Sequence, residues 1–518
     1  MWRESRDTHH VSIVGDVEAD RDGVDPAVAD LAPIAWRFLG PLAGAKVVLQ
    51  LLTSNLYGAH RDEFYYLESG HHLAWGYVDN PPLVPVVYRL QELVFGHSVS
   101  ALAVVPAFLG GVYVILGGLL ARELGGRRYA QLLTGVVACL GSIFLTTSHF
   151  LSTVSLDLVF WALGSLLVLR MTRTGDRRLW IWIGVVCGFG LLNKYTMGFW
   201  IVATVAGLLL TSQRRLMASV WLPTGAVVAA VMVAPNILWE IDNHWPTWQF
   251  LRNIRASGAH SNLIQFAPVQ LLLVTLGGAI VWITALIVLT RPEWRPQRWL
   301  LIGYVVAFTI LIALAGKPYY LGSWYLPLVA VGSVAIEHRW RRPARGVVLG
   351  AVAVTGLLFA PFATPLVPEA TAVRLHIDTS NADIGGMMGW TTTMAYISRD
   401  FHRLPVGQQR HAVILTSNYS EAGAIDFYAA TYRLPDAISG HNSFWTWGYG
   451  RPAAQATVLA VGLPGDVVRR YWGSVVRVDT LESGPTPIDP HERGVPIWIC
   501  RNQRVPWAEL WPQLKHFD

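Results

Sequence analysis

Charged residues, lysine and cysteine are scarce in this chain. Only 14% of its 518 residues are charged, and four of these are lysine. The three cysteines are too few and too far apart to indicate a disulfide framework or a cysteine-based metal site. The sequence has no glycine-rich phosphate loop and so does not indicate a nucleotide cofactor. These absences count against a small disulfide-rich protein and against a P-loop enzyme.

Hydrophobic residues, by contrast, make up 53% of the chain, and the mean hydropathy is +0.38. Several apolar runs reach the roughly 20 residues that are needed to cross a bilayer. The expected spans are residues 36–57, 100–121, 129–148, 152–170, 179–193, 195–212, 216–237, 264–290, 299–316, 320–337 and 346–363. The sequence therefore predicts an α-helical polytopic membrane protein with eleven transmembrane helices.

Short connections rich in arginine follow the even-numbered spans, among them RELGGRR, RMTRTGDRR and HRWRRPAR. Positive residues favour the cytoplasmic side of a membrane, so these connections are expected in the cytoplasm. The net charge of +6 thus reflects membrane orientation, and no nucleic-acid partner is expected. The same pattern predicts a multi-pass protein of the cell (inner or plasma) membrane with a cytoplasmic N-terminus.

Three regions are expected. Residues 1–33 are polar and acidic and predict a disordered cytoplasmic tail. Residues 34–363 predict a transmembrane catalytic domain with long outer loops at 58–98 and 238–262. Residues 364–518 predict an extracytoplasmic α/β domain, because strand-like AVILT, VVRVDTL and VPIWIC occur there with a helix starting near Ser420 or Glu421.

The first outer loop concentrates acidic and aromatic residues in HRDEFYYLESGHHLAWGYVDNPP. Asp62 and Glu63 follow the first span, where a partly desolvated carboxylate can act as a general base. Only one of two adjacent helical residues can face a cleft, and we favour Asp62, with Glu63 as support. Capping of the following helix is the alternative. Asp157, one or two turns inside the fourth span, needs a partner and is a third candidate catalytic residue, unless its serine-rich turn only binds neighbouring helices.

Cations also occur on the expected outer side. Lys194 and Lys317 stand at outward span ends, and Arg252 and Arg255 follow in the second outer loop. Such cations favour binding of a lipid phosphate, although snorkelling at the interface is the alternative for each one. Tyr319 and Tyr320 suit either an aromatic belt or contact with sugar and isoprenoid.

The roles of three further groups of residues cannot be decided from the sequence alone. The candidate metal ligands, which have no diagnostic spacing, are His71, His72, His149 and His244. Lys46 lies near the middle of the first span and either snorkels or faces the interior of the bundle. The residues that either cover the cleft or pack within the C-terminal domain are His441, Asn442 and Trp445.

A family resemblance rests on DEFYYLESGHHLAWGYVDNPPL, NKYT, WPTWQF, GKPYYLGSWYLPL and NYSEAGAIDFY. These segments resemble the bacterial membrane glycosyltransferases of family 39, the protein O-mannosyltransferase-like group with the GT-C fold. The chain is more distantly similar to the aminoarabinose transferases of lipid A. The resemblance covers about residues 35–450.

The resemblance implies an inverting hexosyl- or pentosyltransferase that uses a polyprenyl-phosphate sugar donor at the outer face of the membrane. It implies that Asp62 activates the acceptor, which is a lipid, a polysaccharide or a protein, and that Asp157 is the second acidic residue of the cleft. Membrane lipids are the other expected partners. No cofactor is required, and a divalent metal stays open. The expected substrate contacts are Tyr65, His71, His72, Asp79, Asn80, His244, Tyr319 and Tyr320.

One departure concerns the residues before Pro81 and Pro82. The aminoarabinose branch has a Glu-Lys pair there, and this chain has Asp79 and Asn80. Binding of the carrier phosphate is therefore expected to fall to the cations named above.

Two other functions are consistent with composition alone. A transporter or lipid flippase with an outer binding domain would use Lys46 and Asp157 in a substrate path, and it predicts repeated groups of spans, which the sequence lacks. A membrane scaffold that binds cell-wall components would need no clustered carboxylates.

Overall fold

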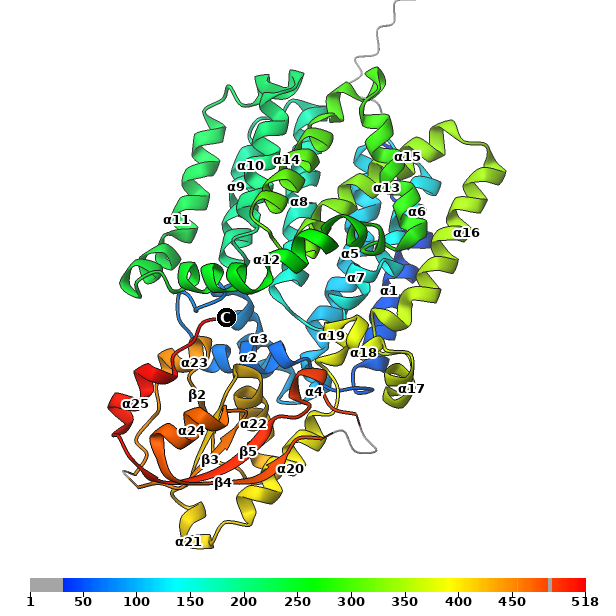
Figure 1. Cartoon of the computed structure of the whole chain (residues 1–518). Coiled ribbons are helices and arrows are strands. Elements are labelled where there is room, and N and C mark those ends of the chain that lie inside the picture. Colours follow the sequence, from blue (N-terminus) through cyan, green and yellow to red (C-terminus); the bar gives the residue numbers. More distant parts are fainter. Residues whose placement is uncertain (1–30, 454, 483–486) are drawn as a thin grey trace, which may run out of the picture.

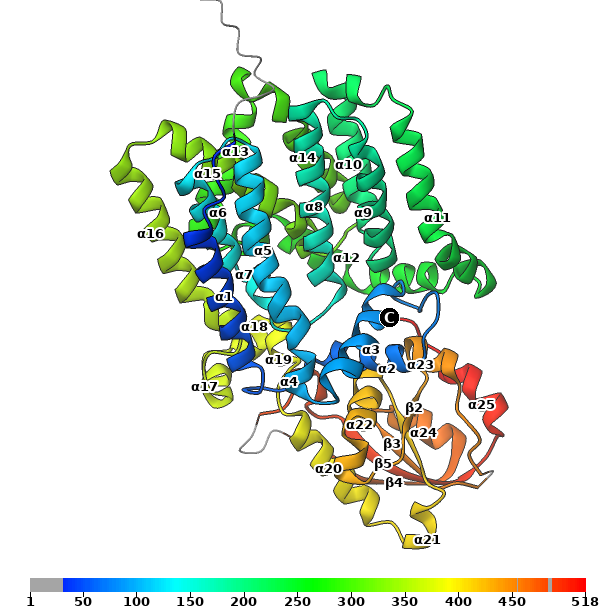
Figure 2. The ribbon, with the colours of Figure 1, turned by 180° about the vertical axis from the view of Figure 1, so that it is seen from behind.

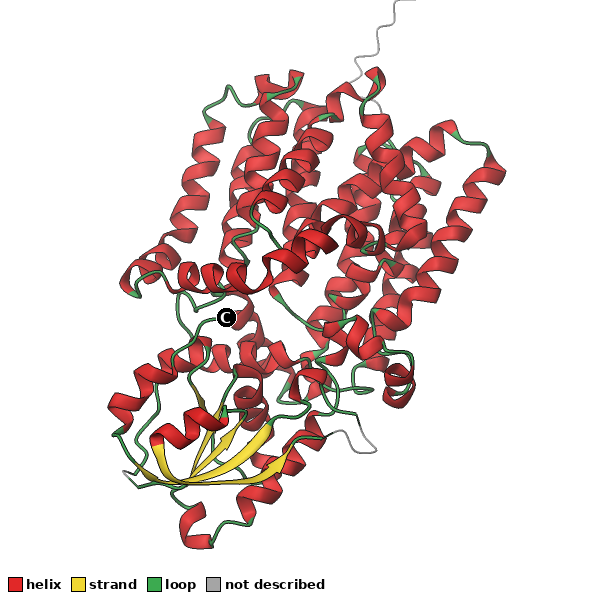
Figure 3. Cartoon of the chain, in the orientation of Figure 1, coloured by secondary structure: helices red, strands yellow, loops and turns green. Residues whose placement is uncertain are grey.

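The computed structural model of the chain describes residues 31–453, 455–482 and 487–518. Helices dominate it, and one small sheet lies towards the C-terminal end of the chain (Figure 3). The predicted fold class, a helical polytopic protein with a C-terminal α/β region, is therefore confirmed. Most of the predicted N-terminal tail, residues 1–30, lies outside the described residues.

A bundle of apolar helices forms the membrane region (Figure 1). Its helices are α1 (Trp36–Thr53), α5 (Val104–Glu123), α6 (Arg128–Leu140), α7 (Ser142–Thr146), α8 (Thr153–Thr174), α9 (Leu179–Asn193), α10 (Met197–Leu209), α11 (Trp221–Asp242), α12 (Pro246–Leu272), α13 (Thr275–Leu289), α14 (Trp299–Ala313), α15 (Tyr325–Arg339) and α16 (Arg342–Phe359). Within the described ranges, five helices are long and apolar enough to cross a membrane alone, or six if one bent pair counts as a span. Each predicted run overlaps a helix, but the number of eleven crossings stays a prediction.

Two of the predicted spans, 129–148 and 264–290, are not continuous helices. The first breaks at Gly141, between α6 and α7. The second is bent by 93° where α12 meets α13. The breaks meet, because the Ile143 N–H donates to the Leu273 carbonyl over 2.8 Å. At membrane depth, the backbone departs from helical geometry only where its N–H and C=O groups can bond to other protein groups or face a cavity. A cavity is therefore expected at this junction.

Shorter elements cover one end of the bundle. They are α2 (Arg61–His71), α3 (Leu83–Phe95), α4 (Val99–Leu102), α17 (Glu369–Arg374), α18 (Ile377–Ser380) and α19 (Ala382–Gly385). The first half of α12 runs across this same end (Figure 1). Helix α3 follows Pro81 and Pro82 as predicted, and it exposes Leu90, Leu93 and Val94. An amphipathic helix of this kind suits a membrane surface.

The C-terminal region begins with α20 (Trp390–His402) and α21 (Val406–Gln409) and then alternates strands with helices. The strands are β1 (Val413–Thr416), β2 (Ala437–Ser439), β3 (Val458–Val461), β4 (Trp472–Thr480) and β5 (Pro496–Gln503), and the helices are α22 (Tyr419–Tyr432), α23 (Asn442–Trp447), α24 (Gly465–Tyr471) and α25 (Trp507–Leu514). The sheet order is β2-β1-β3-β5-β4, with β1 parallel to both neighbours and β5 antiparallel to both of its own. Strands β1, β4 and β5 and the helix near Ser420 occur where the sequence predicts them, whereas β2 and β3 were not predicted.

This C-terminal domain, residues 390–518 of the structure, packs directly on α2. Phe64 and Leu67 of α2 share one apolar core with Ala422 and Ile425 of α22. The approach is close because Gly423 has no side chain: a Cβ there would lie 2.9 Å from the Phe64 backbone. Burial of these apolar side chains stabilises the contact and fixes α22 against the first outer loop.

The arginine-rich connections lie at the other end of the bundle. The turns between α10 and α11, between α13 and α14 and between α15 and α16 are all far from the sheet (Figure 1). The view from behind shows the same arrangement (Figure 2). Arg127, Arg128, Arg173 and Arg215 line one cavity at that end. The acidic first outer loop and the arginines therefore lie on opposite sides, as the charge pattern predicts.

Candidate functional site

The start of α2 separates the two adjacent acidic residues. His60 is the N-cap, and its Nδ1 accepts the Asp62 backbone N–H over 3.1 Å. Glu63 completes the capping box by accepting the His60 N–H over 2.9 Å, and it also accepts the Tyr88 hydroxyl. Both Glu63 oxygens are thus used to hold the helix, and the side chain is buried. Asp62 points elsewhere, as expected for the neighbouring position on a helix.

Asp62 lines a cavity of about 420 Å³ at the junction of the two broken spans. Its polar lining residues are Asp62, Tyr66, Ser142, Thr146, Thr147, Ser152, Thr153, Lys194, Tyr319, Ser380, Asn381 and Asp383. Its apolar lining residues are Ile143, Phe150, Val154, Val269, Leu272, Leu273, Phe359 and Phe362. One cavity thus combines a carboxylate, a cation, hydroxyl groups and a wall from α12 and α16.

The Asp62 carboxyl group is held as a carboxylate. Burial by itself would raise its pKa, but His60, Arg61, the Tyr419 hydroxyl and Lys317 together hold that pKa below its usual value. Burial also lowers the pKa of His60, so the lasting positive charge comes from Arg61, whose Nε lies 4.0 Å from Asp62 Oδ1. The side chain of Asp62 keeps 32% of its surface accessible through the cavity. An ionised and accessible carboxylate is what a general base requires.

Lys194 enters the same cavity from the end of α9. Its Nζ lies 4.5 Å from the centre of the Tyr320 ring and 5.6 Å from that of Tyr319. Lys317 also contacts Tyr319, with its Nζ 5.9 Å from the ring centre. Lys194 is within electrostatic range of Asp62, Asp157 and Lys317. Two of the four predicted phosphate-binding cations therefore gather beside the predicted base.

Asp157 lies behind this cluster and does not line the cavity. Its carboxylate accepts hydrogen bonds from Trp161 Nε1 at 3.0 Å and from the Thr196 hydroxyl at 2.9 Å. The Ser323 hydroxyl donates a longer bond of 3.4 Å. A carboxylate with three donors is positioned to balance the charge of Lys194 rather than to take a proton from substrate.

The remaining predicted cations and histidines lie outside the cavity. Arg252 and Arg255 are exposed on α12, and His244 is exposed just before it. His71 pairs with Glu68 and Glu92 on the surface, which raises its pKa to about 9. His72 stacks on Trp447 with ring centres 4.4 Å apart. The structure therefore does not bring these residues to the Asp62 cavity.

Tyr65 joins the first outer loop to the C-terminal domain, and Asp79 and Asn80 make their hydrogen bonds within the loop. The Tyr65 hydroxyl lies 2.6 Å from Asp79 Oδ1 and 2.7 Å from the Ser443 hydroxyl. Asn80 is buried, and its side-chain amide donates to the Pro81 carbonyl. Burial raises the pKa of Asp79 to about 6 despite the Tyr65 hydrogen bond. These three residues hold the loop in place next to the site.

One cluster in the described part of the chain could hold a metal ion, and it lies outside the Asp62 cavity. It consists of His441, His516 and Asp518 in the C-terminal domain. His149 is instead buried against Gln50, with His149 Nδ1 2.9 Å from Gln50 Oε1. His441 and Asn442 contact Asp518, and Trp445 donates to the Trp511 carbonyl. His441, Asn442 and Trp445 thus make these contacts within the C-terminal domain, which is one of the two alternatives left by the sequence.

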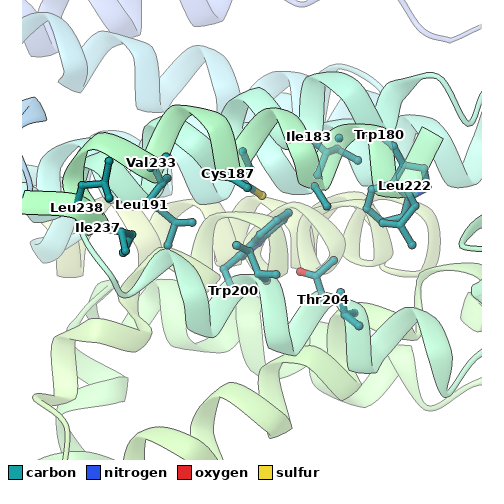
Figure 4. Close-up of a pocket in the computed structure, with 18 residues that line it drawn as sticks. Trp180, Ile183, Cys187, Leu191, Trp200, Thr204, Leu222, Val233, Ile237 and Leu238 are labelled. Atoms are coloured by element: carbon teal, nitrogen blue, oxygen red, sulfur yellow. The ribbon is translucent and has the colours of Figure 1, made fainter. Parts of the chain in front are cut away.

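A separate cavity of about 640 Å³ lies between α9, α10 and α11 (Figure 4). Its lining is apolar and includes Trp180, Ile183, Leu191, Trp200 and Leu238. No carboxylate or cation lines it, so it offers no group for acid–base chemistry. An apolar groove of this kind suits hydrocarbon chains.

Sequence reasoning did not single out Tyr66, Asp383 or Tyr419. Tyr66 and Asp383 line the Asp62 cavity, and the Tyr419 hydroxyl donates to Asp62 Oδ1 over 2.9 Å. Tyr419 is 357 residues away from Asp62 in the chain. In the sequence, Tyr419 is marked only by its position at the start of the helix predicted in NYSEAG. That position does not show that the residue contacts Asp62.

Comparison with known families adds independent information. Residues 79–239 match the model of the dolichyl-phosphate-mannose-protein mannosyltransferases. This stretch is about a third of the chain and includes Asp157 and Lys194, whereas Asp62 lies before it. No curated protein matches the sequence at a significant level.

Two solved structures resemble the whole chain. ArnT from Cupriavidus metallidurans bound to undecaprenyl phosphate has a TM-score of 0.59 and 14% identity, over 90% of this chain and 98% of ArnT. The arabinofuranosyltransferase AftD from Mycobacteria has a TM-score of 0.51 and 12% identity, over 92% of this chain and 41% of AftD. Identities this low show a shared fold. The chain is therefore a multi-pass membrane protein with the GT-C fold of the membrane glycosyltransferases, and the resemblance noted from its sequence is confirmed.

Proposed function

We propose that this protein is an inverting glycosyltransferase that moves a sugar from a polyprenyl-phosphate carrier to an acceptor at the outer face of the cytoplasmic membrane. The observation that carries the proposal is the cavity shared by Asp62 and Lys194. A base for the acceptor and a cation for the departing phosphate are the two groups that this transfer needs. The fold, shared with ArnT and AftD, supports the same class of reaction.

In the proposed step, a hydroxyl or amine of the acceptor attacks the anomeric carbon of the donor sugar. The proton of the acceptor passes to Asp62 Oδ2, and the bond between the anomeric carbon and the phosphate oxygen breaks. Polyprenyl phosphate leaves with the bonding electrons. Attack from the face opposite the phosphate inverts the anomeric centre. Asp62 is suited to this role because its lowered pKa keeps it ionised at neutral pH.

The donor is proposed to bind with its phosphate near Lys194 and Lys317. These cations stabilise the charge that grows on the phosphate as the bond breaks. The first isoprene units would lie on the apolar wall, to which Leu272 and Phe359 contribute. We propose that Arg252 and Arg255 have no direct part in phosphate binding, since both are exposed away from the cavity. No cofactor is needed in this scheme.

The proposed orientation follows from charge. The arginine-lined end of the bundle faces the cytoplasm by the positive-inside rule. The Asp62 cavity and the C-terminal domain then face outwards, where a lipid, polysaccharide or protein acceptor is available. Labelling single cysteines introduced at Gly175 and Gly407 with an impermeant reagent tests this placement, because only the second is expected to react from outside.

The activity is tested with purified protein and a panel of undecaprenyl-phosphate sugars that carry mannose, arabinofuranose or aminoarabinose. Release of free undecaprenyl phosphate in the presence of membrane acceptors supports the proposal and identifies the sugar. Tight binding of donors without any release over long incubation would contradict it and favour the transporter alternative.

A further inference from the structure

We propose that Tyr419 of the C-terminal domain is a positioning residue for Asp62, so that this domain completes the active site. The inference rests on the proposed function, in which Asp62 is the base. It assigns a role to a domain whose purpose the sequence leaves open, and it names the contact through which that domain acts.

The contact is a single hydrogen bond between two distant parts of the chain. The Tyr419 hydroxyl donates to Asp62 Oδ1 over 2.9 Å. The Arg61 Nε also lies nearest to Oδ1, at 4.0 Å. Both positive or donating groups therefore face one oxygen of the carboxylate.

The other oxygen is left for substrate. His60 Nδ1 lies 3.9 Å from Asp62 Oδ2, too far for a hydrogen bond, and this nitrogen already accepts the Asp62 N–H. Within the described ranges, no residue forms a hydrogen bond with Oδ2, and Asp62 lines the cavity. Tyr419 thus fixes the rotation of the carboxylate so that Oδ2 can accept a proton from the acceptor.

The position of Tyr419 is itself well defined. It is the first residue of α22, whose N-cap Asn418 forms a capping box with Glu421. Its backbone N–H donates to His441 Nδ1 over 3.3 Å. Its ring contacts the rings of Tyr65 and His441, with ring centres 4.7 Å and 4.8 Å away. A side chain that contacts two rings and is held at its backbone and at its hydroxyl has little rotamer freedom.

The close packing of α22 on α2 fixes the position of Tyr419 relative to Asp62. Gly423, one turn after Tyr419, allows α22 to approach the Phe64 backbone directly. Burial and the Asp62 charge raise the pKa of the Tyr419 hydroxyl well above its usual value, so it stays protonated and remains a donor. A movement of the C-terminal domain away from α2 would remove the hydrogen bond and disorder the base.

The test uses Tyr419→Phe, which removes the hydroxyl and keeps the packed ring. Tyr432→Phe is the matched control, because this hydroxyl on the same helix donates to the Thr391 carbonyl at the surface. We expect Tyr419→Phe to lower kcat about 10- to 100-fold, with little change in KM for the donor. The acid limb of the kcat profile is expected to move to higher pH, since a carboxylate that loses a donor is protonated more easily.

A second readout needs no substrate. Dicyclohexylcarbodiimide modifies protonated carboxyl groups in apolar surroundings, and mass spectrometry of the Asp62 peptide at a series of pH values reports the titration of Asp62. The midpoint is expected to rise in Tyr419→Phe and to stay at the wild-type value in Tyr432→Phe. A role limited to packing would move neither this midpoint nor the kcat profile.

The outcomes separate this inference from the proposed function. An unchanged kcat, pH profile and labelling midpoint in Tyr419→Phe, with Asp62→Asn inactive, would overturn the positioning role and leave Asp62 as the base. Turnover retained in Asp62→Asn would overturn the assignment of Asp62 as the base. A folded Tyr419→Phe protein with a shifted midpoint and a lowered kcat supports the inference.

Discussion

The ammonium group of Lys46 in α1 donates to the Phe144 carbonyl over 2.9 Å and to the Ala138 carbonyl over 2.8 Å. These two carbonyls lie on either side of the break at Gly141, where the helix no longer supplies N–H partners. Lys46 is buried and faces the interior of the bundle, which decides between the two alternatives left by the sequence. It stabilises the broken span that forms one wall of the Asp62 cavity.

Replacement of this lysine is therefore expected to weaken the membrane region. Lys46→Met keeps the apolar stem but removes the ammonium donor from two buried carbonyls, of which only the Phe144 carbonyl keeps another side-chain donor, the Ser148 hydroxyl. The free energy of unfolding should therefore fall by about 1 to 3 kcal/mol. Thermal unfolding in detergent measures the change. Arg410→Met, which removes a cation at an exposed position, serves as the control and should match wild type. Equal melting temperatures for the two variants would show that Lys46 does not support the break.

Loss of either cation beside the cavity should weaken donor binding. Lys194→Gln and Lys317→Gln each remove a positive charge near the proposed phosphate position, and we expect a rise of about 10- to 100-fold in KM for the donor. Arg252→Gln and Arg255→Gln should behave like wild type, because both arginines are exposed away from the cavity. Steady-state release of the carrier measures all four. The opposite ranking would place the phosphate at α12.

The partly buried Asp79 makes stability depend on pH. Burial raises its folded-state pKa to about 6, above the value in an unfolded chain. An acid with a raised pKa stabilises the fold at low pH, and this contribution is lost as pH rises from about 4 through 6. Asp79→Asn keeps an acceptor for Tyr65 and removes the titration. The melting temperature of Asp79→Asn relative to wild type should therefore increase as pH rises through this window, and the difference should be constant at higher pH. A difference that is constant at all pH values would contradict the assignment.

Chelation of divalent ions should leave transfer intact. The scheme uses Lys194 and Lys317 to stabilise the departing phosphate, and no step passes through a metal. Purified protein treated with EDTA and then freed of the chelator is expected to release carrier at the untreated rate. Loss of activity that returns on addition of Mg²⁺ or Mn²⁺ would show that the cations of the chain are insufficient.

Much of the fold follows from local sequence patterns. The apolar runs mark the helices, and strand-like AVILT and VPIWIC mark two strands of the sheet. The breaks in 129–148 and 264–290 were not predicted, because an apolar run looks continuous even where a glycine or a tertiary hydrogen bond interrupts the helix. The apolar composition of a span follows from its location in the membrane. A break in the helix depends instead on a hydrogen-bond partner elsewhere in the chain, such as the Leu273 carbonyl.

The candidate site divides in the same way. Asp62, Lys194, Lys317, Tyr319 and Tyr320 come together as their places at span ends suggest, since those ends meet on one side of a bundle. Arg252, Arg255 and His244 share that side but point away, and the sequence has no signal for the direction of a side chain on a surface helix. The contact of Tyr419 depends on docking of a whole domain, which local pattern cannot show.

The role of Asp62 as the base is tested by the turnover of Asp62→Asn beside that of Asp466→Asn, an exposed replacement in the C-terminal domain. Both proteins should fold and bind donor like wild type. We expect kcat for carrier release to fall about 10²- to 10⁴-fold in Asp62→Asn and to be unchanged in Asp466→Asn. Wild-type turnover in a folded Asp62→Asn protein would contradict it.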